Sequence, residues 1–232
     1  MTKNIETDIL IIGAGPVGLF TVFEAGLLGL KCHLVDNLDK IGGQCIELYP
    51  EKPIYDIPGV PNQTGKEHID SLLKQIEPFD YEVHLNQRVD KIEESGDYWI
   101  AETTDGISFK TLNIFIAAGA GSFEPRKPPV ESPDKFLGKG IDYAVRSVDK
   151  YKDKDIVIFG GGDSALDWSV ELANKAKSIK LVHRRDDFRG AEHTENKMRN
   201  FVASGEIELK IPCVIKSLVG GKSFEGGEIM NF

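Results

Sequence analysis

One local pattern occurs twice in this chain of 232 residues, first from residue 8 and again from residue 155. In each copy a short apolar run leads into a glycine-rich turn, a helical apolar pattern follows, and a second apolar run ends the copy. This order predicts a βαβ unit, in which a helix joins two buried parallel strands. The expected strands are 8–12, 31–35, 155–159 and 178–182, and the expected helices are 19–28 and 166–176.

The residues between the two copies have the period of an antiparallel meander. Strand patterns cover 87–93, 98–103 and 107–110, and a further apolar run over 112–118 predicts another buried strand. Four prolines then fall within nine residues, which excludes a helix or a central strand there. The sequence therefore predicts an α/β fold with two Rossmann-like dinucleotide-binding domains of the three-layer ββα type, over residues 1–121 and 122–232.

The first glycine turn has the spacing Gly-x-Gly-x-x-Gly, with glycines at Gly13, Gly15 and Gly18. The first glycine permits the tight turn, the second lets a pyrophosphate approach the backbone, and the third lets the helix pack on the strand. Pro16 is tolerated in the first turn of the helix. Asp36 ends the next strand, where a carboxylate accepts hydrogen bonds from an adenosine ribose. This copy predicts a site for an unphosphorylated adenine dinucleotide.

The second turn predicts a similar pyrophosphate site, but a different charge follows it. Its strand ends on His183, Arg184 and Arg185 in place of an acidic residue, and Arg189 is available as a third contact. Two charge-assisted bonds of about 1.5–3 kcal/mol each would favour NADPH over NADH by roughly a hundredfold or more. The predicted NADP-binding residues of the turn itself are Gly160, Gly162, Asp163, Ser164 and Ala165.

Composition restricts the class of protein further. The chain is 41% hydrophobic and 28% charged, as in a soluble globular protein, and its net charge of −9 argues against nucleic acid as a partner. It has no apolar run of about 18 residues, so no membrane partner is expected. Cys32, Cys45 and Cys213 form no Cys-x-x-Cys pair, which favours a cytoplasmic location. We predict no metal site, and we expect the scattered histidines other than His183 to be surface or hydrogen-bonded polar residues.

Several segments resemble the ferredoxin/flavodoxin–NADP reductases of the thioredoxin-reductase-like type. The Tyr-Pro-Glu-Lys segment at 49–52 is the most specific of them. The resemblance implies an enzyme with FAD in the first domain and NADP(H) in the second. Such an enzyme transfers electrons between NADPH, a hydride donor, and ferredoxin or flavodoxin, and is expected to be a homodimer. The segments that carry the resemblance are 42–45, 48–52, 55–59, 117–127, 160–168 and 183–189.

The same resemblance implies roles for individual residues. Asp36 would hold the FAD ribose, while Gln44 and Tyr49 would contact the flavin half, with Tyr49 stacked on the isoalloxazine ring. Val89 would contact the adenine through its backbone, and Phe123 would lie near the flavin at the domain junction. Gly43 belongs to the same predicted FAD-binding set. Because the flavin carries the reaction, no acid or base residue is expected to be obligatory.

Two features of the chain, its cysteine positions and its length, leave alternatives open. Thioredoxin reductases carry a Cys-x-x-Cys shortly before the second glycine turn, whereas this chain has no cysteine between Cys45 and Cys213. A disulfide reductase would therefore need cysteines outside this chain. Family members are also longer, so we expect this chain to be truncated at its C-terminus, within the second domain. The remaining alternative is a truncated nucleotide-binding module without catalysis.

Overall fold

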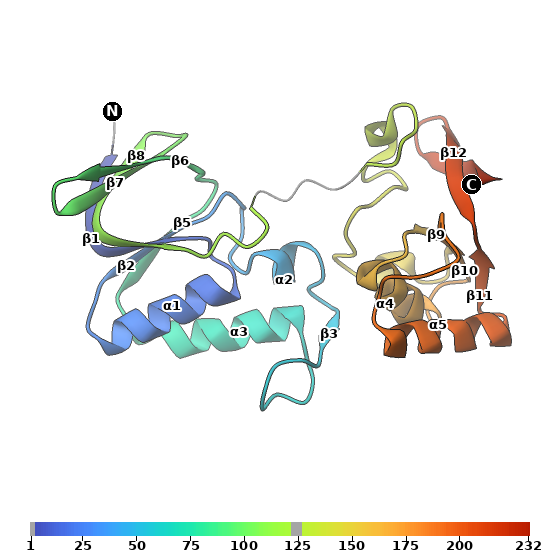
Figure 1. Ribbon diagram of the computed structural model, residues 1–232, viewed down its shortest axis with the longest axis horizontal. Coiled ribbons are helices and arrows are strands. Elements are labelled where there is room, and N and C mark those ends of the chain that lie inside the picture. Colours follow the sequence, from blue (N-terminus) through green and yellow to red (C-terminus); the bar gives the residue numbers. More distant parts are fainter. Residues whose placement is uncertain (1–2, 122–126) are drawn as a thin grey trace. The chain divides into compact units, whose positions relative to one another are not determined.

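A computed structural model of the protein describes residues 3–121 and 127–232. The chain divides into two compact units, Met1–Glu124 and Pro125–Phe232. The sequence places the boundary three residues earlier, after residue 121. Each unit has its own hydrophobic core, and each contains one copy of the glycine turn (Figure 1).

The first unit is built on a six-stranded sheet whose first four strands are parallel. The last two strands join it in antiparallel pairing and form the predicted meander. Strand β1 is longer than the predicted run, since it starts five residues earlier. In spatial order the strands are β5 (Tyr81–His84), β2 (Cys32–Val35), β1 (Lys3–Ile12), β8 (Ile107–Ile116), β7 (Tyr98–Thr103) and β6 (Val89–Ser95).

Two helices cover one face of this sheet, α1 (Pro16–Leu27) and α3 (Gly65–Ile76) (Figure 1). Residues of β1, β2 and both helices form one core cluster, in which Ile11, Leu19 and Ile76 are fully buried. A capping box at Thr64 starts α3. In the sequence between α1 and α3 come β2, the short helix α2 (Gln44–Glu47) and the paired strands β3 (Pro53–Ile54) and β4 (Gln63–Thr64).

The meander covers the other face of the parallel strands and makes the third layer. Leu10 and Val35 from β1 and β2 pack there with Ala101 and Phe109 from β7 and β8. Partly buried Val89 of β6 packs against the same cluster. The first unit is therefore a helix layer, a parallel sheet and a meander, which is the three-layer arrangement predicted from the sequence.

The prediction of a separate buried strand over 112–118 is wrong. These residues continue β8, which runs unbroken from Ile107 to Ile116. Leu112, Phe115 and Ile116 are 46%, 47% and 73% exposed. The physical reason is that β7 pairs with β8 only as far as Thr111, so the later residues have a strand neighbour on one side alone, β1.

The second unit contains a smaller parallel sheet in the order β11-β10-β9. Helices α4 and α5 pack with it in one core around Leu166, Leu181 and Met198. Two 3₁₀ turns precede the sheet (Pro133–Phe136 and Asp149–Tyr151), and an antiparallel hairpin follows it. Among the described residues, no helix is long and apolar enough to cross a membrane. The elements are β9 (Asp155–Phe159), α4 (Asp163–Leu172), β10 (Ser178–Val182), α5 (Glu192–Ser204), β11 (Ile207–Lys210), β12 (Cys213–Gly220) and β13 (Phe224–Asn231).

Candidate functional site: two glycine turns

The first glycine turn lies where the strand order of the first unit reverses. Strand β2 follows β1 on one side of it, whereas β8 pairs with β1 on the other side. In open α/β sheets, ligands bind beyond the carboxyl ends of the strands at such a switch point. The ends of β1 and β8 meet there, because Ala117 donates its amide to Ile12 at 2.8 Å.

The three glycines of this turn have different reasons to lack a side chain. A Cβ on Gly13 would lie 2.3 Å from the carbonyl oxygen of Ala117, and the residue has φ +112°. A Cβ on Gly18 would lie 1.9 Å from the carbonyl oxygen of Gly13. Both glycines are therefore required for packing. A Cβ on Gly15 would meet only Gly43, at an ordinary 3.8 Å. No described neighbour needs Gly15 to be a glycine, whereas a pyrophosphate at this helix end would need one.

Asp36 lies beside this turn and is held by two backbone amides. Its Oδ2 accepts from Ala14 at 2.7 Å, and its Oδ1 accepts from Leu38 at 2.9 Å. The backbone of Asp36 pairs with His84 and Gln87 at the end of β5. Pro16 occupies the first turn of α1, as predicted. The structure therefore brings Gly13, Gly15, Gly18 and Asp36 together around one helix N-terminus.

A second loop closes on the first turn. Gly42 donates to the carbonyl of Ala14 at 2.9 Å, and Gly43 lies so close that a Cβ on it would be 3.0 Å from the Cα of Gly15. Gln44 is exposed at the start of α2. A Cβ on Gly119, beyond the end of β8, would lie 3.4 Å from the Gln44 amide nitrogen. Gly43 and Gln44 thus border the same turn.

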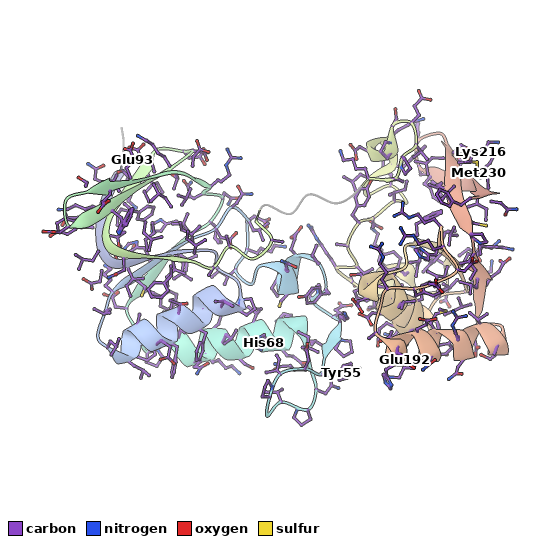
Figure 2. All side chains as sticks on the ribbon, in the orientation of Figure 1. Tyr55, His68, Glu93, Glu192, Lys216 and Met230 are labelled. Atoms are coloured by element: carbon purple, nitrogen blue, oxygen red, sulfur yellow. The ribbon has the colours of Figure 1, made fainter. Side chains whose placement is uncertain are left out.

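Tyr49 follows α2 and is half-buried against the core of the first unit. The thiol of Cys45 donates to its hydroxyl at 3.8 Å, and the ammonium of Lys52 lies 5.7 Å from the ring centroid. Burial raises the pKa of Tyr49 to about 12, so its hydroxyl stays protonated. Segment 55–59, which also carries the family resemblance, forms the loop between β3 and β4. Tyr55 in this loop is 64% exposed (Figure 2).

The two other predicted FAD contacts differ in what the structure says of them. Val89 is the first residue of β6. Two residues before it, the amide of Gln87 donates to the carbonyl of Asp36 at 2.9 Å, which brings the start of β6 near Asp36. Phe123 lies outside the described residues. The first unit thus gathers the predicted turn, Asp36, Gly43 and Gln44, with Val89 two residues beyond a direct contact of Asp36.

The second glycine turn repeats this geometry after β9. Gly160 has φ +156° and donates its amide to Val182 at 3.1 Å, as Gly13 does to Val35 at 2.8 Å. A Cβ on Gly161 would lie 2.3 Å from the His183 ring. Gly162 caps α4 with φ −104°, and a Cβ there would meet no atom within 4 Å. As at Gly15, packing leaves this position free and the helix end open to an anion.

The first turn of α4 contains the remaining predicted residues of this site. Ser164 is exposed, and Ala165 donates its amide back to Gly162 at 3.0 Å. Asp163 also lies in this turn, and its Oδ1 accepts the backbone amide of Ala191 at 2.9 Å. The sequence does not reveal this contact, which joins α4 to residues 28 positions later.

The loop from 183 to 190, called the arginine loop below, joins β10 to the segment before α5. Arg184, Arg185 and Arg189 are all exposed in it. Among the residues that the structure describes, none of the three pairs with a carboxylate. Burial, together with these arginines, lowers the pKa of His183, which favours the neutral ring. Its Nε2–H donates to the carbonyl of Asp187 at 3.2 Å. Three unpaired guanidinium groups beside an open helix N-terminus can bind a phosphate.

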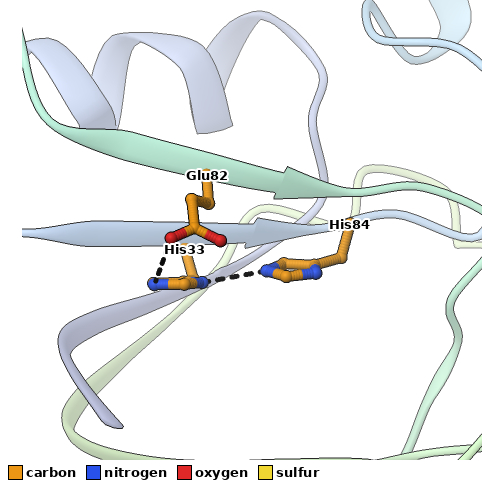
Figure 3. A group of neighbouring side chains, drawn as sticks. All are labelled: His33, Glu82 and His84. Atoms are coloured by element: carbon orange, nitrogen blue, oxygen red, sulfur yellow. Dashed lines mark hydrogen bonds and ion pairs between the residues drawn. The ribbon is translucent and has the colours of Figure 1, made fainter. Parts of the chain in front are cut away.

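A cluster on the meander side of the first sheet was not anticipated. Nδ1 of buried His33 and Nε2 of His84 are 2.9 Å apart, and Glu82 lies 3.9 Å from the other His33 nitrogen (Figure 3). The rings are within 12° of coplanar with centroids 5.2 Å apart, so the nitrogens face each other edge to edge. A tetrahedral ion would hold two nitrogens about 3.3 Å apart with converging lone pairs. The geometry is therefore that of an N–H···N hydrogen bond.

Comparison with known proteins places these features in a family. Residues 7–227 match the family described as pyridine nucleotide-disulphide oxidoreductase. A ferredoxin–NADP reductase of Bradyrhizobium sp. is 56% identical over 212 residues, which cover 91% of this chain and 62% of that protein. One of Beijerinckia indica is 50% identical over 233 residues, which cover 99% of this chain and 66% of that protein. The chain thus spans less than two thirds of the length of these relatives.

Solved structures agree with the predicted fold. Thioredoxin reductase of Lactococcus lactis is similar with a TM-score of 0.80 and 25% identity, over 97% of this chain and 73% of that one. Thioredoxin reductase of T. acidophilum has a TM-score of 0.83 at 17% identity, over 97% of this chain and 71% of that one. The α/β class with two Rossmann-like domains is confirmed.

Proposed function

Because this chain belongs to the pyridine nucleotide-disulphide oxidoreductase family, we propose that it is part of an FAD-dependent enzyme that transfers electrons between NADPH and ferredoxin or flavodoxin. One observation carries the proposal: a carboxylate follows the first glycine turn, and guanidinium groups follow the second. FAD, when bound, exchanges two electrons with a nicotinamide and single electrons with such a carrier. The relatives at 50–56% identity are named ferredoxin–NADP reductases.

The first unit suits the FAD pyrophosphate and ribose. The open position at Gly15 allows phosphate oxygens to reach the N-terminus of α1, whose amides and partial positive charge stabilise an anion. Asp36 would accept the ribose hydroxyls, since each of its oxygens has one lone pair left after its backbone bond. Gln44 borders this turn and would contact the flavin half, and Tyr49 would stack on the ring.

The second unit suits NADPH for a matching reason. Gly162 leaves the N-terminus of α4 open to a pyrophosphate. The arginine loop presents Arg184, Arg185 and Arg189 to the 2′-phosphate, which NADH lacks. A carboxylate at the equivalent place, such as Asp36 in the first unit, would repel that phosphate.

Reduction of a disulfide is the alternative suggested by the thioredoxin reductases among the structural relatives. That reaction needs two neighbouring thiols that exchange with the flavin and with a substrate. All three cysteines of this chain are buried, and burial raises the pKa of Cys32 to about 11 and also that of Cys45. Protonated, buried thiols are poor nucleophiles. With the cysteines of this chain, direct electron transfer to a one-electron carrier is therefore the better proposal, and a disulfide reductase would need cysteines outside it. We also propose that the enzyme is a cytoplasmic homodimer.

The test measures flavin content and coenzyme choice in one preparation. The purified chain should bind FAD and, with NADPH, reduce ferricyanide much faster than with NADH. The double substitution R184A/R185A should remove most of a preference of about a hundredfold. Unchanged selectivity would contradict the role of the arginines. A chain that binds nucleotides but never retains flavin would instead support the non-catalytic module.

A further inference from the structure

Within six residues the arginine loop carries three exposed arginines, with the exposed Asp186 and Asp187 between them. Ordering three long arginine side chains around a ligand costs conformational entropy. A loop that selects a 2′-phosphate must therefore be held in place before the ligand arrives. Contacts from outside the loop hold its far end, and contacts within it add to them.

Two backbone amides fix the far end of the loop, one on the second glycine turn and one on the side chain of Asp163. Arg189 donates its amide to the carbonyl of Gly161 at 2.7 Å. Two residues later, the amide of Ala191 donates to the Asp163 carboxylate at 2.9 Å. Gly190 between them lies so close to α4 that a Cβ would be 2.5 Å from Leu166 and 3.2 Å from the Asp163 amide nitrogen. The loop is thus seated directly on the end of α4.

An aromatic contact holds the middle of the loop. The Phe188 ring stacks on His183 with centroids 5.2 Å apart and an angle of 24°. The guanidinium of Arg199 on α5 lies 5.7 Å from the same Phe188 ring, and Glu195 binds that guanidinium. Phe188 lies between Arg185 and Arg189 in the sequence. Its ring therefore links His183, which follows β10, to Arg199 on α5.

The charge of Asp163 points away from a direct role in binding the nucleotide. A carboxylate in the first turn of α4 repels a pyrophosphate bound at that same helix end. Its observed partner is instead the amide of Ala191, at the end of the arginine loop. The contact explains why an acidic residue is present where an anion is expected to bind.

We propose that Asp163 is a positioning residue, which holds the arginine loop on the second glycine turn and so sets the preference of this unit for 2′-phosphorylated adenine nucleotides. This inference rests on the proposed assignment of NADPH to the second unit. It assigns to Asp163 a role in selectivity that acts through Arg184, Arg185 and Arg189. Phe188 supports the same loop from its other side.

The test compares two small ligands that differ by one phosphate. Binding of 2′,5′-ADP and of 5′-AMP to the whole chain is measured by calorimetry at one ionic strength, and the ratio of the two affinities is the readout. D163A should lower this ratio about tenfold, mainly by weakening 2′,5′-ADP. D163N should keep most of the ratio, because an amide oxygen still accepts the Ala191 amide.

Two further variants keep the test decisive. Phe188→Leu should lower the ratio in the same direction without touching Asp163. Glu192→Gln removes a charge one residue beyond Ala191, at the start of α5 (Figure 2), and should leave the ratio unchanged. Circular dichroism and Trp168 fluorescence check that each variant is folded.

Three results would overturn the proposal. A folded D163A with the ratio of the original chain would exclude a positioning role. Equal losses in D163A and D163N would show that the charge, rather than the hydrogen bond, matters. If the original chain itself fails to prefer 2′,5′-ADP, the assignment of NADPH to this unit is wrong and the inference falls with it.

Discussion

Asp36 accepts the backbone amide of Ala14 at 2.7 Å, across 22 residues of sequence. The residue that follows β2 therefore also fixes the turn that follows β1. The amide of Leu38 binds the other carboxylate oxygen at 2.9 Å, so the carboxyl group cannot rotate freely. A carboxylate that is already oriented loses little entropy when it binds a ribose diol.

Replacing Asp36 by Asn should weaken FAD binding by about tenfold to a hundredfold, because one charge-assisted hydrogen bond is worth about 1.5–3 kcal/mol. The affinity is measured from the change in flavin fluorescence on binding. Asp39→Asn removes the same charge three residues later from an exposed side chain, and should leave the affinity unchanged. An equal effect of both substitutions would point to net charge rather than to a contact of Asp36.

The position of Asp36 could be predicted because it depends on local sequence. A strand, a turn of fixed length, a helix and a second strand bring residue 36 back to residue 14 whatever the rest of the chain does. The same reasoning gives β9 and β10 at their exact bounds. The meander pattern between the two copies likewise gives β7 over Tyr98–Thr103.

Contacts that depend on how distant strands and loops meet could not be predicted in this way. The pairing of His33 with His84 follows from the parallel register of β2 and β5, in which His33 lies opposite Glu82. Likewise, the exposure of Leu112 follows from the length of β7, since an apolar run alone does not show where its neighbour ends. Distant register is the missing information in both cases.

Alanine at Gly13 should mainly lower stability, whereas alanine at Gly15 should mainly lower FAD affinity. Gly13→Ala should destabilise the first unit by about 3 kcal/mol or more, because its φ is +112° and the Cβ would overlap the Ala117 carbonyl. Gly15→Ala should change stability by less than about 1 kcal/mol, yet weaken FAD binding at least tenfold, since its Cβ would fill the space of the pyrophosphate. Urea unfolding and flavin titration measure the two effects. A Gly15→Ala chain with unchanged FAD affinity would exclude this turn as the pyrophosphate site.

In the second glycine turn, the neighbouring residues Gly161 and Gly162 allow the same comparison of stability with nucleotide affinity. Gly161→Ala should destabilise the second unit, because its Cβ would lie 2.3 Å from the His183 ring. Gly162→Ala should fold normally, since no atom lies within 4 Å of that Cβ, and should weaken 5′-AMP and 2′,5′-ADP alike. Calorimetric titration with both ligands is the measurement. A selective loss of 2′,5′-ADP alone would mean that the phosphates do not bind at this helix end.

The His33–His84 pair gives the first unit a specific dependence on pH. Burial lowers the pKa of both rings, and Lys3 contributes to both shifts. Glu82 acts in the opposite direction on both, while Lys31, 3.5 Å from Glu82, lowers the pKa of His33. His33 Nδ1 and His84 Nε2 are 2.9 Å apart, so only one of them can carry a proton while the hydrogen bond is kept. Charging both rings puts a proton on each nitrogen and breaks the bond.

The folded pKa values of His33 and His84 thus lie below the unfolded value of about 6.5. The stability they contribute is present above that value and is lost as pH falls from about 7 through 6.5 towards the folded pKa. The slope of the unfolding free energy against pH should therefore be smaller in His84→Gln than in the original chain. Trp168→Phe in every protein leaves Trp99 of β7 as the fluorescent reporter of the first unit. His68→Gln, in the same unit (Figure 2), should keep the original slope, and a His84→Gln slope equal to it would show that the pair does not govern this dependence.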